Sequence, residues 1–279
     1  MRILLCLNRD FISNIAFNRL RPALQGHAFD VVLSRGIGKR SAPRASELEA
    51  WSRLEQRLID EGLYPLLDAR PSGGTFQSFD RLAQASRSRN IMESDDINRA
   101  AGLDYVRTFN PDAIVSIRFG QIFKAPIIEI PRLGIVNLHS GILPDYRGIL
   151  ATFWALLNGE AEIGCTLHYV TDATIDTGPI IGVHRMRAAR DKSLLWNIAS
   201  LYDGGTALLA DTLAKLSDGR AIATVAQDAR SGRTYSYPEE EHVAQFLERG
   251  NRLYSKDDYA EIFALYGVKL KAIGSEADL

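Results

Sequence analysis

Short apolar runs alternate with amphipathic stretches along the first two thirds of the chain. Arg2–Leu7, Phe29–Ser34, Pro111–Ile117, Gly134–His139 and Ile163–Val170 each have the length and apolar content of a buried strand. In the stretches between them, apolar residues recur at helical spacing. Strands that alternate with helices are typical of a parallel sheet covered by helices. The pattern therefore predicts an α/β fold with a mostly parallel sheet.

The predicted helices vary widely in length. They cover Asp10–Arg21, Ala45–Glu61, Phe79–Ser86, Asp95–Phe109, Thr152–Asn158, Ser193–Leu216, Glu239–Arg249 and Lys256–Tyr266. We place helix starts near Asp95 or Asp96 and at Asp191, because short acidic residues are favoured there. Pro71–Gly74 is the clearest break in the first half, and we interpret it as a loop inside one domain.

Ile180–Arg187 reads as one more strand of the sheet. The last 60 or so residues differ from the alternating pattern, because Ala221–Pro238 reads as a hairpin with a turn at Asp228–Arg233. Two helical pieces and a polar tail follow the hairpin. We therefore divide the chain into a main domain, residues 1–218, and a small hairpin and helical extension, residues 219–279.

Composition narrows the classes of function. The 279 residues are 46% hydrophobic and 24% charged, with a formal net charge of −1. Such a balance gives no electrostatic reason for binding nucleic acid or an anionic membrane. Cys6 and Cys165 lie in apolar strands, so we interpret them as buried thiols in a reducing compartment. No apolar run approaches the ~20 residues of a spanning helix. These features predict a cytoplasmic protein.

Candidate chemistry is concentrated between Gly134 and Ile181. Asn137 and His139 are two residues apart on a strand, so their side chains point to the same face. The strand then breaks into a loop at Ser140–Gly148, and open α/β sheets place their ligands at such strand ends. Asp176 follows in a Gly/Pro turn. An amide, an imidazole and a carboxylate together can polarise a carbonyl and move a proton.

Two loops bear on cofactors and substrates. Asn8–Phe11 follows the first strand without a glycine, so the dinucleotide-binding fingerprint is absent. No ligand spacing typical of a metal site is present either. Gly36–Pro43 is basic, and Lys39 and Arg40 could meet an anionic acceptor, although a solvated loop is the better interpretation. The role of residues 36–75 stays open.

Three segments resemble one family. GIVNLHSGILPDYRG (134–148), GCTLHYVTDATIDTGPII (164–181) and PDAIVSIRFGQIF (111–123) resemble the formyltransferases that use 10-formyltetrahydrofolate. That family includes glycinamide ribonucleotide formyltransferase, methionyl-tRNA formyltransferase and sugar N-formyltransferases. The resemblance implies a Rossmann-like formyltransferase fold. It also implies that Asn137, His139 and Asp176 are the catalytic residues.

The resemblance further implies a folate donor and no metal. It assigns the folate pocket to the strand end after Ile117 and to the later Gly/Pro turn. The residues are Arg118, Phe119, Gly120, Gln121, Ile122 and Phe123, with Thr171, Asp172 and Ile175. A hydrophobic staple is the alternative interpretation of the aromatic pair. Relatives usually read His-x-Ser-Leu-Leu-Pro, whereas the serine here follows His139 directly.

Contacts to the acceptor are less specific. Ser140, Tyr146, Arg147 and His168 are candidates, but the shifted serine prevents a direct transfer of its family role. Arg147 is equally interpretable as a surface residue, and His168 as a wall residue.

The acceptor itself is predicted to be an amine of a small molecule. The C-terminal piece is shorter than the barrel of the methionyl-tRNA enzyme and contains Glu239–Glu241. The loop after the first strand also lacks the glycines that hold a phosphate in the purine relative. A nucleotide-linked amino sugar or an ornithine- or hydroxyornithine-like metabolite is therefore expected. Alternatives are a formyltetrahydrofolate hydrolase, a methionyl-tRNA formyltransferase-like protein and a folate-binding sensor. Tyr235 and Tyr237 of the hairpin could pack against a second subunit, which predicts a homodimer, or flank the acceptor pocket.

Overall fold

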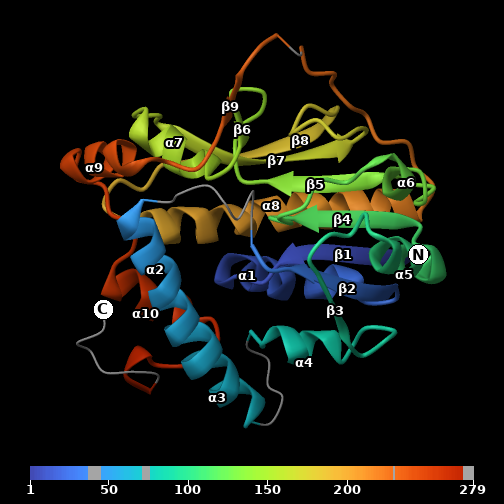
Figure 1. Ribbon diagram of the computed structural model, residues 1–279, viewed down its shortest axis with the longest axis horizontal. Coiled ribbons are helices and arrows are strands. Elements are labelled where there is room, and N and C mark those ends of the chain that lie inside the picture. The colour runs from blue at the N-terminus through green and yellow to red at the C-terminus, as the bar shows by residue number, and fades with distance from the viewer. Residues whose placement is uncertain (37–44, 71–75, 229, 273–279) are drawn as a thin grey trace.

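A seven-stranded sheet forms the centre of the molecule in the computed structural model, which describes residues 1–36, 45–70, 76–228 and 230–272 (Figure 1). Its strand order is β3-β2-β1-β4-β5-β7-β8, and the first five of these strands are parallel. β7 and β8 continue the sheet in antiparallel pairing. The strands are β1 (Arg2–Asn8), β2 (Ala28–Ser34), β3 (Ile91–Ser94), β4 (Ala113–Ile117), β5 (Ile135–His139), β7 (Glu162–Val170) and β8 (Ile180–Arg187). The predicted mixed α/β fold is confirmed.

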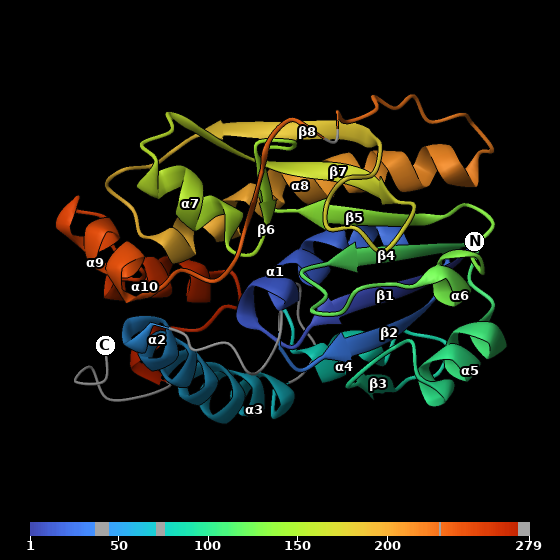
Figure 2. The same cartoon turned by 45° about the horizontal axis from the view of Figure 1, so that its top comes forward.

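Helices cover both faces of the sheet (Figures 1 and 2). Alternate residues of β1 enter two separate apolar clusters: Ile3 and Leu5 face α1 and α8, whereas Leu4 and Cys6 face α5 and α6. This is the period-2 pattern of a strand buried on both sides. The helices are α1 (Phe11–Leu20), α2 (Ser46–Gln56), α3 (Tyr64–Asp68), α4 (Phe79–Ala83), α5 (Ala100–Phe109), α6 (Ala125–Ile128), α7 (Ala151–Leu157), α8 (Leu194–Ser217), α9 (Glu240–Glu248) and α10 (Lys256–Ala264), with shorter turns η1 (Arg21–Leu24) and η3 (Leu270–Ala272).

Several predicted boundaries were wrong. The helix predicted to end at Glu61 continues through a π-helical segment, η2 (Arg57–Leu63), into α3. β3 was missed, because this four-residue edge strand carries no alternating pattern. α5 begins five residues after Asp95 and has Arg99 as its N-cap. α8 is capped by the Ser193 side chain and not by Asp191.

The predicted hairpin at 221–238 is wrong. β9 (Arg233–Tyr235) instead pairs in parallel with β6 (Tyr146–Gly148), a strand of the loop after β5. Val225 makes an isolated antiparallel bridge with Ile180 at the edge of the main sheet. Residues 219–228 and 230–238, which we call the strap, therefore cross from the end of α8 to α9 over the carboxyl-end loops (Figure 2). Tyr235 stacks on Tyr146 and Trp154 within the chain.

The C-terminal helices pack on the first helix and on α2. Phe11 lies against the rings of Tyr259 and Tyr266, and the Trp51 indole donates to the Tyr259 hydroxyl at 2.9 Å. These contacts fix α2 beside the β1–α1 turn, although α2 belongs to a long insertion between β2 and β3. The division at residue 218 and the homodimer stay predictions.

Two predicted features lie outside the described residues, namely the Pro71–Gly74 break and the loop containing Lys39 and Arg40. Both cysteines are buried and unbonded, as predicted, and burial raises the pKa of each thiol above its ordinary value. None of the helices in the described part of the chain has both the length and the apolar character needed to cross a bilayer.

Candidate active site

A cavity of about 510 Å³, which we call the catalytic cavity, opens at the carboxyl ends of β4 and β5. This edge adjoins the point between β1 and β4 where the strand order reverses, the usual ligand position of open α/β sheets. The predicted residues that line it are Asn137, His139, Asp176, Arg118, Phe119, Gly120, Gln121, Ile122, Phe123, Thr171, Asp172, Ile175, Ser140 and His168. Tyr146 and Arg147 do not line it.

The three predicted catalytic side chains meet at this edge. Asn137 Nδ2 donates to Asp176 Oδ1 at 3.3 Å, and Nδ1 of His139 lies 3.5 Å from Asp176 Oδ2. Asn137 and His139 come from the same face of β5, whereas Asp176 arrives from the loop between β7 and β8. β7 runs antiparallel to β5 and ends opposite Ile135, so the β7–β8 loop starts near the amino end of β5 and reaches back to bring Asp176 to the two side chains.

His139 is hydrogen-bonded at one ring nitrogen and faces a carboxylate with the other. Its Nε2 lies 2.7 Å from the backbone oxygen of Tyr146, and its Nδ1 faces the Asp176 carboxylate. Because both neighbours are acceptors, the ring can donate from both nitrogens when it is protonated. Nδ1 is the nitrogen left for exchange with a reacting group. The ring is 9% exposed, which limits competition from bulk water.

Asp176 is the residue that joins the site. Its φ of 55° lies in the left-handed region, where aspartate is tolerated, and its Oδ2 accepts from Gly148 N at 2.8 Å. Burial would raise the pKa of this carboxyl. The charge of His139, the hydrogen bond from His168 and the Gly148 N–H outweigh burial and hold the pKa well below its usual range. Asp176 is therefore a carboxylate throughout the physiological pH range.

The predicted acceptor contacts occupy different places. His168 Nε2 lies 3.1 Å from Asn137 Nδ2 and 3.4 Å from Asp176 Oδ1, so His168 helps to position these two side chains. Tyr146 is buried, and its hydroxyl donates to Glu160. Arg147 is 4% exposed and its guanidinium donates to the Ser231 carbonyl of the strap. The alternative interpretation of Arg147 as a surface residue is wrong.

One wall of the catalytic cavity suits a flat heterocycle. The rings of Phe119 and Phe123 stack at 5.3 Å, and Ile122 and Ile175 are 50% and 46% exposed. Exposed apolar side chains beside a concave polar site are typical of a ligand surface. The Gln121 amide is already occupied by the chain, since it accepts from Ile97 N and donates to the Ser94 carbonyl. Gln121 therefore shapes the wall and has little capacity left for a ligand.

The strap supplies a contact that sequence reasoning missed. The Gln227 amide donates to the backbone oxygens of Asp176, at 2.9 Å, and Gly178, at 2.7 Å. Arg147 donates in turn to Gln227 Oε1 at 3.1 Å. The strap thus fixes the loop that carries Asp176. No local pattern in the sequence pairs residue 227 with residue 176, which is 51 positions away.

Gly141 is expected to be essential for placing His139. A Cβ at this position would lie 2.7 Å from His139 Nε2 and 2.6 Å from the Tyr146 oxygen, closer than real contacts allow. Gly141→Ala should therefore shift the imidazole and lower turnover about 10- to 100-fold. Gly159→Ala is the control for replacing a loop glycine, since nothing lies within 4 Å of that position, although its positive φ adds some backbone strain. Steady-state kinetics would measure both, and unchanged turnover in Gly141→Ala would contradict the assigned role of His139.

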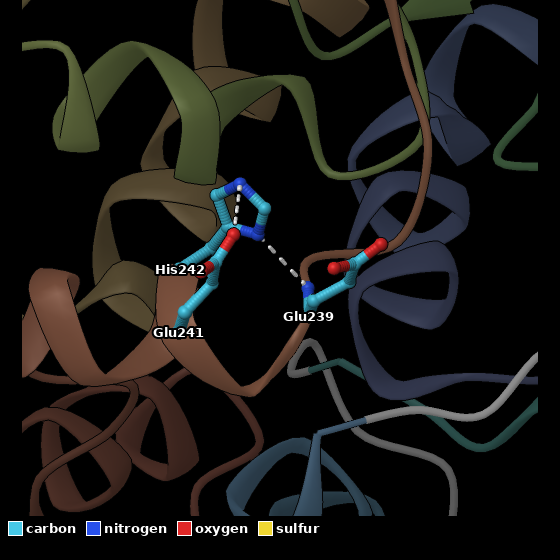
Figure 3. A group of neighbouring side chains, drawn as sticks. All are labelled: Glu239, Glu241 and His242. Carbon is cyan, nitrogen blue, oxygen red and sulfur yellow. Dashed lines mark hydrogen bonds and ion pairs between the residues drawn. The ribbon is translucent and has the colours of Figure 1, made fainter.

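A group of possible metal ligands lies away from the cavity. Glu239, Glu241 and His242 come together at the start of α9, and no other such group occurs in the described ranges (Figure 3). His242 Nδ1 accepts from the Glu239 N–H, which closes a capping box. The cluster is explained by helix capping.

Comparison with known proteins identifies the family that this site resembles. Residues 76–213 match the formyl transferase family model. The methionyl-tRNA formyltransferase of Agathobacter rectalis is 33% identical over 139 residues, which are 50% of this chain and 44% of that protein. The enzyme of the same name from Trichlorobacter lovleyi is 38% identical over 133 residues, 46% of this chain and 40% of its own. The chain thus spans less than half the length of these relatives.

Solved structures share the fold. A 4-N formyltransferase from Francisella tularensis has a TM-score of 0.55 at 14% identity, over 84% of this chain and 76% of its own. An N-formyltransferase from Helicobacter canadensis, complexed with folinic acid and dTDP-3-aminofucose, has 0.52 at 17%, over 85% and 71%. A glycinamide ribonucleotide transformylase from Symbiobacterium toebii has 0.52 at 18%, over 82% and 94%. The predicted resemblance to formyltransferases is confirmed.

Proposed function

We propose that this chain, whose residues 76–213 match the formyl transferase family model, moves a formyl group from 10-formyltetrahydrofolate to an amine of a small molecule. The observation that carries the proposal is the meeting of Asn137, His139 and Asp176 beside an apolar wall. The pterin of the donor would lie against Phe119 and Phe123, with Asn137 and His139 at the formyl group.

The reaction forms a bond between the acceptor nitrogen and the formyl carbon and breaks the bond between that carbon and the donor nitrogen. Negative charge develops on the formyl oxygen, and a proton must pass from the acceptor nitrogen to the donor nitrogen. The Asn137 amide can donate to the oxygen without ionising. Fixed donors of this kind typically contribute about 3–4 kcal/mol of transition-state stabilisation.

His139 would carry the proton, and Asp176 would assist it as an anion. The Nδ1 position faces Asp176, so the carboxylate stabilises the imidazolium that forms when His139 takes a proton. Asp176 can also order a water molecule between the acceptor and the donor. Since the pKa of Asp176 lies well below its usual range, it would act as an anion and not as the acid.

Folates should stabilise the folded chain, whereas NAD, ATP and divalent cations should not. A ligand that binds only the folded state at 100 times its Kd contributes about 2.7 kcal/mol. Thermal unfolding with a non-transferable reduced folate would measure the shift. Stabilisation by a nucleoside triphosphate together with no response to folates would contradict the donor assignment.

The acceptor is proposed to be a small molecule, although the curated relatives are named for methionyl-tRNA. Binding of tRNA depends on Lys and Arg contacts to phosphates. The chain has 33 Lys and Arg against 34 Asp and Glu residues, and the first turns of α9 and α10 contain Glu240–Glu241 and Asp257–Asp258. A gel-shift titration at about 150 mM salt tests this point. Binding of initiator tRNA at micromolar concentration, with formylation of its methionyl ester, would replace the small-molecule proposal.

A further inference from the structure

A second cavity adjoins the catalytic cavity. It has a volume of about 500 Å³ and is lined by the β1–α1 turn, by α2 and by η2. The two cavities share Arg118, Leu150 and Tyr237, so a molecule in the second can extend toward the first. α2 and η2, which form one wall, belong to the long insertion between β2 and β3, whose role the sequence left open.

This cavity is unsuited to a phosphate at the start of α1. The Asp10 carboxylate occupies that helix end, where it accepts from Ser13 N at 2.7 Å and from Asn8 Nδ2 at 2.7 Å. Arg118 Nε lies 3.0 Å from the same carboxylate. A helix N-terminus binds anions through its free N–H groups and its dipole, and here an aspartate already uses both.

The cations that line the cavity are paired within the chain. Arg118 pairs with Asp10, while Arg9 and Arg35 both pair with Glu93. Two further lining carboxylates, Glu55 and Asp60, have no ion-pair partner among the described residues.

Tyr64 supplies an independent indication of a ligand. Its side chain lines the second cavity and is 8% exposed, and its hydroxyl has no hydrogen-bond partner in the described part of the chain. Leaving a buried hydroxyl unpaired costs about 1–3 kcal/mol. The aromatic ring of Trp51 lines the same cavity and provides a surface for a cation or an alkyl chain.

From these contacts we infer that the second cavity binds a cationic group of the acceptor, distal to the amine that is formylated, through Glu55 and Asp60. The inference rests on the proposed formyl transfer and specifies its acceptor class. The acceptor is a dibasic small molecule, such as a diamine or a diamino acid, and not a phosphorylated ribonucleotide or a nucleotide-linked sugar.

Protonation of Glu55 supports this assignment. Burial, and then the charge of Asp10, raises the pKa of Glu55 to about 8, against the opposing effects of Arg118 and the Tyr259 hydroxyl. The charge of Asp60 adds a smaller effect in the raising direction. A carboxyl that is protonated when the cavity is empty ionises when a cation arrives. Binding of a dibasic ligand should therefore release a proton near pH 7.

Isothermal titration calorimetry with 1,4-diaminobutane and 1-aminobutane isolates the second charge. Diaminobutane should bind more tightly, and its apparent enthalpy should change with the ionisation enthalpy of the buffer. Glu55→Gln should weaken it about 10- to 100-fold and abolish proton release, because the carboxyl can no longer ionise. Asp60→Asn should weaken binding without removing proton release. Glu49→Gln, on the exposed side of α2, is the matched control and should bind like the wild type.

Several outcomes overturn the inference. They are equal binding of the two amines, no binding of diaminobutane, L-ornithine or L-lysine, or unchanged binding in Glu55→Gln. Preferential formylation of a dTDP-linked amino sugar would also overturn it while leaving the proposed function intact. Formylation of no amine at all would instead contradict the proposed function. Tyr64→Phe provides a second variant, which should weaken diaminobutane binding without lowering the folding stability.

Discussion

Replacing His139 by alanine is expected to lower the rate of formyl transfer about 100- to 1000-fold while the binding of reduced folate is retained. The ring is fixed by the Tyr146 carbonyl and faces Asp176, so its loss removes both a donor and the proton carrier. The pterin would lie against the stacked rings of Phe119 and Phe123, which the substitution leaves in place. His139→Ala should therefore lower the turnover without weakening the binding of folate.

Single-turnover kinetics and folate titration together measure this separation. His27→Ala is the control, since His27 precedes β2 at the opposite edge of the sheet. Asn137→Ala should show the same pattern as His139→Ala, because its amide is the second donor at the formyl position. Retention of more than about a tenth of wild-type turnover in His139→Ala would rule out its role.

Asp176→Asn should reduce turnover on the order of 1000-fold and also change the pH dependence of stability. In the folded chain the pKa of Asp176 is held below its usual range, so the unfolded chain binds more protons at acid pH. The stabilisation is therefore present above about pH 4 and declines as the pH falls toward the folded pKa. At pH 7 we expect the free energy of unfolding to decrease by about 2 kcal/mol.

Urea unfolding at pH 7 and at successively lower pH values tests the second part. The wild type should lose stability below about pH 4 more steeply than Asp176→Asn, since only the wild type must protonate this carboxyl on unfolding. Asp211→Asn, on the exposed side of α8, is the control. Parallel pH profiles for the wild type and Asp176→Asn would mean that Asp176 is not stabilised as an anion.

The sequence identified the parallel sheet and the residues at its carboxyl edge for physical reasons. Because the other residues of this buried strand are apolar, Asn137 and His139 are conspicuous on β5. Their spacing of two residues places them on the same face. Their contact with Asp176 depends on how the loop between β7 and β8 folds back toward β5, and the resemblance supplied that connection. The prediction succeeded where a local pattern and a specific motif coincided.

The failures share a different cause. The strap contains strand-like residues at 222–227 and 234–237, and local pattern cannot say whether these pair with each other or with distant strands. In the structure Val225 bridges to β8 and β9 pairs with β6. The second cavity was missed for the same reason, since Asp10, Glu55 and Tyr64 are brought together only by the packing of α2, η2 and α3 beside the start of α1.

The central claim is tested most directly by incubating the protein with 10-formyltetrahydrofolate, with and without a panel of amines. The panel should include diaminobutane, L-ornithine, a dTDP-linked amino sugar and methionyl-tRNA. Formation of tetrahydrofolate would be followed by absorbance and the acceptor by mass spectrometry. The account predicts that tetrahydrofolate appears only with a small-molecule amine, in equal amount to an acceptor carrying one added formyl group, and that His139→Ala abolishes both. Release of formate at the same rate without any amine, or folate binding without turnover, would contradict it.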